Sequence, residues 1–204
     1  MLLYAPFFYT MELLIWSNEL NGLIESSSGK SFSDKDIETI KQKTEFSEFD
    51  QISFSPVNIG PGADFWTVLA TIVLVNETFL LIPSALDGMK QWKSVIEIIK
   101  RLIAKRELVA IDVEGAQMLA IDYMSNHYSY KYLQIKDSHI VKLQDFSNVV
   151  RPVSPLASIP YAYYILTIQT DDLKTFILGV KSNGEINMIK VFDYNPYGMT
   201  ESNV

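Results

Sequence analysis

FWTVLATIVLVNETFLLI, residues 65–82, is an apolar run that decides the physical class of this chain. At eighteen residues the run reaches the lower length limit for a helix that crosses a bilayer. Its aliphatic and Phe residues each favour insertion by roughly 0.3 to 0.6 kcal/mol, whereas a central acid such as Glu77 opposes insertion by roughly 2.5 to 3.5 kcal/mol. Insertion is therefore close to balanced, and two alternatives stay open: a core helix and a membrane span.

The helical phase of this run favours a helix inside a folded domain. At 3.6 residues per turn, Asp64, Thr67, Thr71 and Thr78 share one narrow polar sector, and the rest of the surface is mainly apolar. Residues 60–62, Gly-Pro-Gly, stop any earlier regular structure, so Asp64 is expected to be the N-cap. The sequence thus predicts a core helix over 65–82.

The length of 204 residues fits one domain with a sizeable core. No internal repeat divides the sequence, but its patterning changes along the chain. We expect a single domain, 1–204, with an N-terminal β-α-β element at 1–59, a helical layer at 60–128, an antiparallel sheet at 129–195 and a flexible tail at 196–204.

The N-terminal element is predicted from weak alternation and one capping signal. Strands are expected over 9–16 and 51–57, where apolar residues alternate with others. Ser33, followed three residues later by Asp36, indicates a helix that ends near Lys43. The serine-rich stretch 26–31 is read as a loop.

The helical layer continues with two better-defined helices. Residues 90–106 place apolar side chains on one face and basic side chains on the other, which is typical of a surface helix. Asp112 is a plausible N-cap for a further helix, Val113 to His127.

The C-terminal part has the composition of strands. Residues 131–136 and 139–144 are predicted to form a hairpin, followed by strands over 161–169, 174–181 and 185–193. Ser182-Asn183-Gly184 predicts a type I′ turn, since Asn-Gly supplies its positive φ angles. The expected fold class is α+β: an antiparallel β-meander of about five strands packed against two or three helices, with a small N-terminal β-α-β element.

Charge is unevenly distributed along the chain. The net charge is −7, yet residues 90–107 hold six basic against two acidic side chains and are therefore +4, which leaves −11 for the rest. Such a chain is a poor candidate for binding nucleic acid, because that requires a broad cationic surface. An acidic surface suits a basic protein partner. The N-terminus lacks a basic leader, so a cytoplasmic location is expected.

Most catalytic chemistry lacks its sequence signature. Lys30 is the middle residue of a Gly-Lys-Ser triplet, but a phosphate-binding loop would need Gly where Ile24 stands. There is no cysteine, and neither of the two histidines has a ligand spaced for metal binding. We therefore predict no catalytic residue, no metal and no cofactor. One enzymatic alternative remains, a metal-dependent hydrolase that uses Asp112, Glu114, Asp171 or Asp172.

The proline-rich loop 151–160 leads into Tyr161, Tyr163 and Tyr164 and makes a rigid contact surface. The function hypothesis is a non-enzymatic, cytoplasmic protein-interaction module of the adaptor, inhibitor or immunity type. The alternative is a peripheral or single-span membrane protein, with 65–82 in lipid and the basic helix 90–106 on the surface. A tyrosine-rich strand edge could also pair with a second copy of the chain. The candidate partner-binding residues are Tyr161, Tyr163, Tyr164, Asp171, Asp172, Lys100, Arg101 and Lys105.

Overall fold

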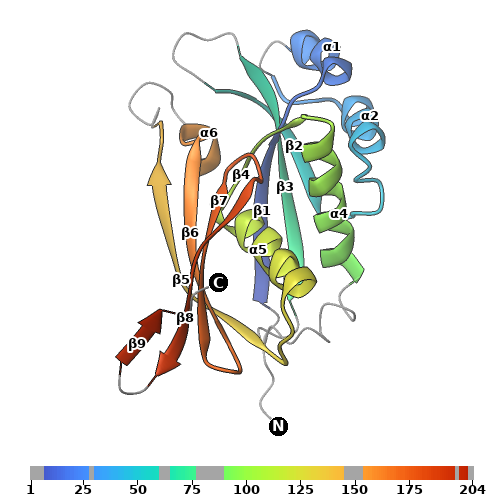
Figure 1. The fold of residues 1–204 in the computed structure, drawn as a ribbon. Coiled ribbons are helices and arrows are strands. Elements are labelled where there is room, and N and C mark those ends of the chain that lie inside the picture. Colours follow the sequence, from blue (N-terminus) through green and yellow to red (C-terminus); the bar gives the residue numbers. More distant parts are fainter. Residues whose placement is uncertain are drawn as a thin grey trace.

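A computed structural model describes residues 7–27, 30–59, 65–76, 90–144, 154–195 and 198–201. Over these ranges the chain forms two antiparallel sheets and five helices, so the predicted α+β class is confirmed. Figure 1 shows helix α5 (Val113–His127) in the centre, with one sheet on each side of it.

The first sheet contains most of the apolar run, and the prediction of a helix there is wrong. Residues 66–76 form a strand, whereas 77–82 and the predicted cap at Asp64 lie outside the described residues. Six of the eleven strand residues are Thr, Val or Ile, whose branched Cβ favours strands over helices. The strand order is β2-β3-β1-β4, all antiparallel, with β1 (Phe7–Ile15), β2 (Ile52–Asn58), β3 (Trp66–Asn76) and β4 (Leu108–Ile111).

The N-terminal β-α-β element differs from the prediction. Both predicted strands exist, as β1 and β2, but β3 lies between them and is antiparallel to each. Two helices, α1 (Asn18–Ser27) and α2 (Asp34–Thr44), connect β1 to β2. Helix α1 includes residues that were predicted as a loop. Only Leu20 and Ile24 of this polar helix are buried, so its sequence has too weak an apolar period to predict a helix.

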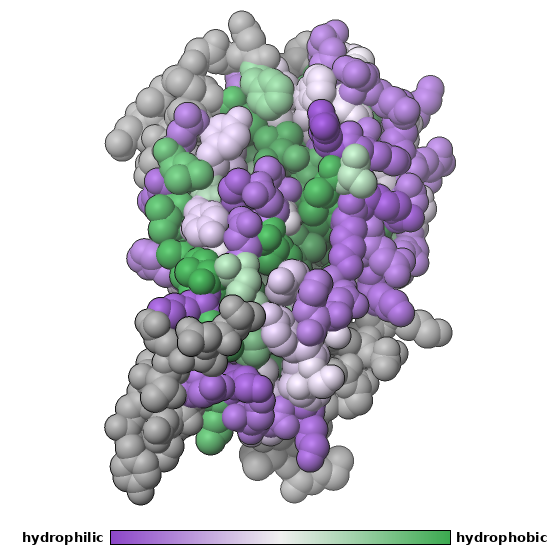
Figure 2. Space-filling view, in the orientation of Figure 1, coloured by the Kyte–Doolittle hydropathy of each residue, from purple (hydrophilic) through white to green (hydrophobic). Residues whose placement is uncertain are grey.

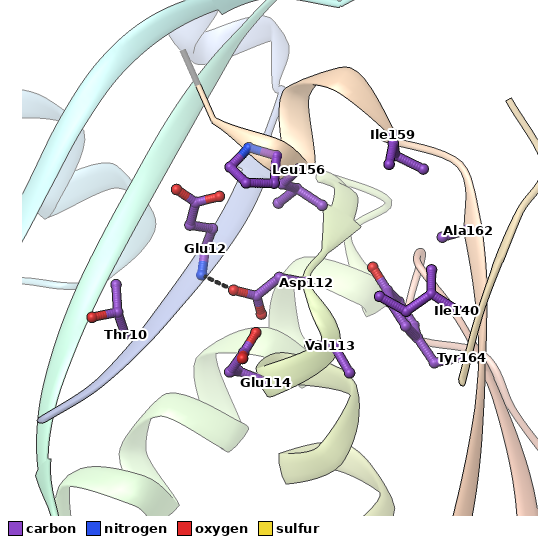
Figure 3. Close-up of a pocket in the computed structure, with 11 residues that line it drawn as sticks. Thr10, Glu12, Asp112, Val113, Glu114, Ile140, Leu156, Ile159, Ala162 and Tyr164 are labelled. Carbon is purple, nitrogen blue, oxygen red and sulfur yellow. Dashed lines mark hydrogen bonds between the residues drawn. The ribbon is translucent and has the colours of Figure 1, made fainter. Parts of the chain in front are cut away.

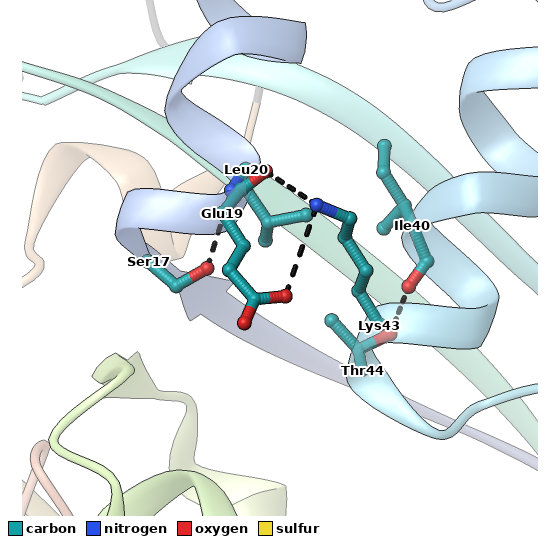
Figure 4. A network of polar contacts seen from close by, with 6 residues as sticks. All are labelled: Ser17, Glu19, Leu20, Ile40, Lys43 and Thr44. Carbon is teal, nitrogen blue, oxygen red and sulfur yellow. Dashed lines mark hydrogen bonds and ion pairs between the residues drawn. The ribbon is translucent and has the colours of Figure 1, made fainter.

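Capping and polar contacts fix these two helices. The predicted cap of α2 is confirmed: the Ser33 side chain accepts from the Asp36 backbone N–H, and the Asp36 carboxylate accepts from the Ser33 N–H. Nζ of Lys43 donates to the backbone oxygen of Glu19, 2.8 Å away, and so joins α2 to α1 (Figure 4).

Helix α4 (Lys90–Ala104) matches the predicted amphipathic helix. Its apolar side chains lie in the core, and the side of the molecule that carries α2 and α4 is mainly hydrophilic (Figure 2). The apolar face of α4 is therefore covered by other parts of the protein. Among the described residues there is no helix long and apolar enough to cross a membrane. The buried side chains of α4 are Trp92, Val95, Ile96, Ile98, Ile99 and Leu102.

The second sheet corrects two strand predictions. Residues 131–144 do not form a hairpin, since 133–142 are one strand with a bulge between Ile135 and Asp137. Residues 198–201, placed in the predicted flexible tail, pair with the preceding strand. The strand order is β5-β6-β7-β8-β9, with β5 (Leu133–Lys142), β6 (Ala162–Thr170), β7 (Lys174–Lys181), β8 (Ile186–Asn195) and β9 (Gly198–Glu201).

The turn between β7 and β8 lies where it was predicted but is of another type. The Gly184 N–H donates to the Lys181 carbonyl over 2.8 Å, and only Gly184 in this turn has a positive φ, of 87°. A type I′ turn would need a positive φ at Asn183 as well. The connection is therefore a three-residue loop that ends in a left-handed glycine.

One hydrophobic cluster joins the two sheets. It contains Met11, Leu13 and Ile15 of β1, the buried face of α4, most of α5 and the inner face of the second sheet. A smaller cluster covers the other face of the first sheet, where Leu14 meets Leu156 of the short helix α6 (Pro155–Ser158). Helix α5 contacts strands of both sheets, so its position fixes how they face each other.

Replacing Gly184 with alanine tests the contact between the β7–β8 turn and the helices. A Cβ there would overlap Ile103 of α4 and would sit on a backbone with positive φ. Because each effect opposes folding, we expect Gly184→Ala to lower the free energy of unfolding by about 1–3 kcal/mol. Gly22→Ala is the matched control, since α1 offers open space there and alanine favours helix, so stability should rise by about 0.5–1 kcal/mol. Denaturant unfolding measures both changes, and equal effects would contradict this account of the turn.

Candidate functional site

A cavity of about 300 Å³ lies where the first sheet, α5, α6 and the second sheet meet (Figure 3). Three acids line it: Glu12 of β1 and Asp112 and Glu114 at the start of α5. The opposing wall is apolar. It is formed by residues of β5, α6 and β6 and by the residue that follows α6. Its side chains are Ile140, Pro155, Leu156, Ile159 and Ala162, with Tyr164 beside them.

Asp112 joins the first sheet to α5. Its Oδ1 accepts from the Gly115 N–H at 2.8 Å and caps the helix, as the sequence predicted. Its Oδ2 accepts from the Glu12 N–H at 2.6 Å, and the Asp112 N–H donates back to the Glu12 carbonyl over 3.2 Å. A single carboxylate therefore fixes both the start of α5 and its distance from β1.

Gly115 lets α5 approach β1 closely. A Cβ on Gly115 would lie 3.1 Å from Cβ of Ile111 and 3.4 Å from Sδ of Met11. Contacts this short leave little room for a side chain, so the first turn of the helix lies against β1 and β4. This approach brings Asp112 within hydrogen-bond distance of Glu12.

Burial dominates the electrostatics of the acids. It raises the pKa of Asp112 to about 8, because loss of solvent opposes the charged form. The nearby negative charges of Glu114 and Glu12 also raise this pKa, whereas the hydrogen bonds from the backbone of Gly115 and Glu12 lower it. Burial also raises the pKa of Glu12, an effect reduced by hydrogen bonds from the Ser154 side chain and the Leu156 backbone. Near neutral pH, Asp112 is therefore mainly protonated.

Tyr164 closes the cavity on the side of the second sheet. Its hydroxyl donates to the Ile111 carbonyl over 2.7 Å, immediately before Asp112. Burial, together with the charges of Asp112 and Glu114, raises the pKa of the Tyr164 hydroxyl. The tyrosine therefore stays a neutral donor and links β6 to the end of β4.

Among the described residues, none that lines the cavity carries a positive charge. The three acids therefore lie together on one side of the cavity, without a cationic side chain among the described residues around them. Buried like charges oppose ionisation unless a counter-ion joins them. The site can thus hold a proton on Asp112, or it can bind a cation in place of that proton.

The three predicted tyrosines have different surroundings. Tyr164 lines the cavity, Tyr161 is exposed before β6, and Tyr163 lies on the other face of the sheet. The ring of Tyr163 covers Gly179, where a Cβ would overlap it. Alternation along β6 places neighbouring tyrosines on opposite faces, so the three do not form one surface.

The predicted acids Asp171 and Asp172 lie in the turn between β6 and β7. The carboxylate of Asp171 accepts from the Lys131 N–H at 2.8 Å, and that of Asp172 pairs with Lys174 at 2.9 Å. They are separated from Tyr164 by most of β6, a distance of about 20 Å at the usual rise of a strand. Their contacts are those of a polar turn.

The predicted cations of α4 and of the residue that follows it are paired with acids of the chain itself. Nζ of Lys100 lies 2.5 Å from Asp122, and the guanidinium of Arg101 lies 2.6 Å from Glu45. Lys105 lies 3.7 Å from the same Glu45. These pairs are partly exposed, so each contributes little to stability.

The acids of the hydrolase alternative form two separate pairs. Asp112 and Glu114 share the cavity, but Asp171 and Asp172 lie at the far end of β6. In the described ranges no group of three or more His, Cys, Asp or Glu residues is arranged to hold a metal ion.

Sequence reasoning missed Glu12 and the cavity itself. Glu12 lies between Met11 and Leu13, two fully buried residues of β1, so a lone acid in an apolar strand was the available signal. The cavity could not be read from sequence, because it joins residues about a hundred positions apart. Ile140 was also missed, since the predicted hairpin did not place it beside β6.

Comparisons with protein-family models, with curated proteins and with solved structures found no match for this chain.

Asp112→Asn tests the charge state of the buried acid. Between about pH 4 and pH 8, Asp112 holds a proton in the folded chain but has released it in the unfolded chain. As pH rises through this range, Asp112 therefore lowers the free energy of unfolding by about 1.4 kcal/mol per pH unit. Asparagine cannot titrate, and it caps helices as well as aspartate does. At low pH we expect Asp112→Asn to be less stable than the wild type, because the amide nitrogen of asparagine cannot accept from the Glu12 N–H. We also expect the unfolding free energy of Asp112→Asn to lack the fall with pH that Asp112 causes in the wild type.

Denaturant unfolding from pH 5 to pH 9 measures the slope. Asp50→Asn, at an exposed acid in the loop before β2, is the control and should keep the wild-type dependence on pH. A wild-type slope unchanged by Asp112→Asn would mean that Asp112 is ionised in the folded protein at neutral pH.

Proposed function

We propose that this protein is a cytoplasmic, non-enzymatic interaction module of the adaptor, inhibitor or immunity type, which receives a basic side chain of a protein partner in the inter-sheet cavity. One observation carries the proposal. Three carboxylates and an apolar wall line the same cavity, and no lining residue in the described part of the chain supplies a positive charge.

The shape and chemistry of the cavity suit a lysine or arginine side chain. Such a side chain has an apolar stem and a charged end, and it buries the stem wherever the end reaches a polar partner. Leu156 and Ile159 would contact the stem, while Glu12 and Glu114 would face the cation. A cation would also favour ionised Asp112, because opposite charges lower the pKa of an acid.

The surroundings of the cavity support a protein as the source of this side chain. Tyr161, which is 41% exposed, directly precedes Ala162 of the cavity wall, and the N–H of Leu143, which is 62% exposed, donates to the Tyr161 carbonyl. Exposed aromatic and apolar residues beside a charged recess are typical of binding hot spots. The excess of acidic residues outside α4 would speed the approach of a basic partner.

Binding of a lysine peptide tests the proposal directly. The probe is a short peptide with one central lysine between alanines, and its matched control has norleucine in place of lysine. We expect the norleucine peptide to bind at least about tenfold more weakly, because it lacks the charged end. The double variant Glu12→Gln/Glu114→Gln should lose about tenfold in affinity for the lysine peptide, whereas Glu48→Gln, at an exposed acid, should not.

Titration calorimetry measures these affinities, and equal binding of the two peptides would contradict the proposal. Affinity purification from native cells without detergent extends the test to the natural partner. A basic protein bound in a fixed ratio to the wild type and depleted with Glu12→Gln/Glu114→Gln is the expected result. A protein retained equally by both forms would bind elsewhere.

Binding should release a proton. The free cavity holds Asp112 protonated near neutral pH, and a cation favours its ionised form, so affinity should rise from pH 6 to pH 8 by up to about tenfold per pH unit. Calorimetry in two buffers of different ionisation enthalpy measures the release, which we expect to approach one proton per peptide at pH 7. Asp112→Asn should abolish it. Affinity that falls with rising pH would contradict the assignment.

A further inference from the structure

The three acids of the cavity differ in how far the protein already binds their carboxylates. Both oxygens of Asp112 accept backbone N–H groups, one of them from Glu12. The Glu12 carboxylate accepts hydrogen bonds from the Ser154 side chain and from the Leu156 backbone. Within the described ranges no group donates to the Glu114 carboxylate. Of the three acids, Glu114 therefore keeps the most acceptor capacity for a group from outside the chain.

The positions of the three acids agree with this difference. Glu114 is the second residue of α5, it is half-buried, and it lines the cavity. Figure 3 shows the Glu12 carboxylate on the side of Leu156, with Asp112 between it and Glu114. The Glu12 carboxylate is thus directed at α6, whereas Glu114 is accessible to a side chain that enters the cavity.

Glu12 joins strand β1 to the short helix α6. Ser154 is buried, and its hydroxyl oxygen caps α6 by accepting from the Ala157 N–H at 3.1 Å. A buried hydroxyl also needs an acceptor for its own proton, and the Glu12 carboxylate supplies that acceptor. Helix α6 carries Leu156 of the cavity wall, which lies in one hydrophobic cluster with Leu14 of β1. The side chain of Glu12 therefore helps to fix the position of the apolar wall.

We propose that Glu114 is the acid that contacts the basic side chain of the partner, and that Glu12 is a positioning residue that holds α6 against β1. This assignment rests on the proposed function, because it divides the binding of one side chain between two acids of the same cavity. Glu114 then makes the cavity selective for a cation. Glu12 makes the wall fit the apolar stem that precedes the cation.

Single variants separate the two roles through the lysine peptide and its norleucine control. Glu114→Gln should bind the lysine peptide about tenfold more weakly and the norleucine peptide as well as the wild type does, so the preference for lysine is lost. Glu12→Ala should weaken the binding of both peptides by a similar factor and keep the preference, because the wall has lost its anchor. Glu12→Gln should recover most of that loss, since its amide oxygen can still accept one of the two hydrogen bonds. Titration calorimetry measures each affinity, and Glu48→Gln, at an exposed acid, should change neither.

A double-mutant cycle on stability tests the contact between Glu12 and Ser154 without any peptide. Glu12→Ala and Ser154→Ala should each lower the free energy of unfolding. Because both remove the same contact, the double variant should lose measurably less than the sum of the two single losses. Glu114→Gln combined with Ser154→Ala is the matched control and should be additive. Denaturant unfolding measures the four free energies of each cycle, and Glu12→Gln can replace Glu12→Ala if the alanine variant does not fold.

Failure of this assignment and failure of the proposed function give different results. Equal binding of the two peptides to the wild type would contradict the proposed function, and the assignment of Glu114 would fall with it. A wild-type preference for lysine that survives Glu114→Gln would overturn the assignment and leave the proposed function in place. Additive stability losses from Glu12→Ala and Ser154→Ala would overturn the positioning role of Glu12.

Discussion

The buried carboxylate of Asp112 is the interaction on which the rest of the structure depends. It caps α5 through Gly115 and accepts from the backbone of Glu12, so it fixes the central helix against the first sheet. Helix α5 in turn contacts the second sheet, where Tyr164 reaches back to the Ile111 carbonyl. The relation between the two sheets is thus set around one polar residue, and the cavity lies at the same place. A polar group in such a position specifies an arrangement that apolar packing alone would leave less defined.

The parts of the fold with local signals could be predicted from sequence. The capping box at Ser33, the cap at Asp112 and the apolar period of α4 depend on residues within a few positions of each other. The run 65–82 could not be assigned by period, because a strand buried on both sides and a buried helix are both apolar throughout. Its β-branched residues were the better guide. The bulge in β5 was hidden in the same way, since Asp137-Ser138 has the composition of a turn.

The site was predictable only in pieces. Asp112 and Glu114 were considered as a possible acid pair, and the loop 151–160 with Tyr164 was considered as a contact surface, but no sequence signal related the two. Their meeting depends on α6 covering the first sheet and on Gly115 admitting α5 close to β1. Glu12 completes the set from a strand that is otherwise buried. Such long-range juxtaposition is a property of packing, and a single sequence does not contain it in any local pattern.

Two cations of α4 pair with acids that do not line the cavity. Lys100 pairs with Asp122 and Arg101 pairs with Glu45, so neither serves as a counter-ion of the cavity acids. Three acids near one another, with no cation among the described residues that line the cavity, oppose folding unless one holds a proton. Burial raises the pKa of Asp112 to about 8, so this acid holds a proton near neutral pH. A sequence selected for stability alone would replace this arrangement by apolar residues of similar size. In the function that we propose, a cationic side chain of a partner would supply the counter-charge in place of the proton on Asp112.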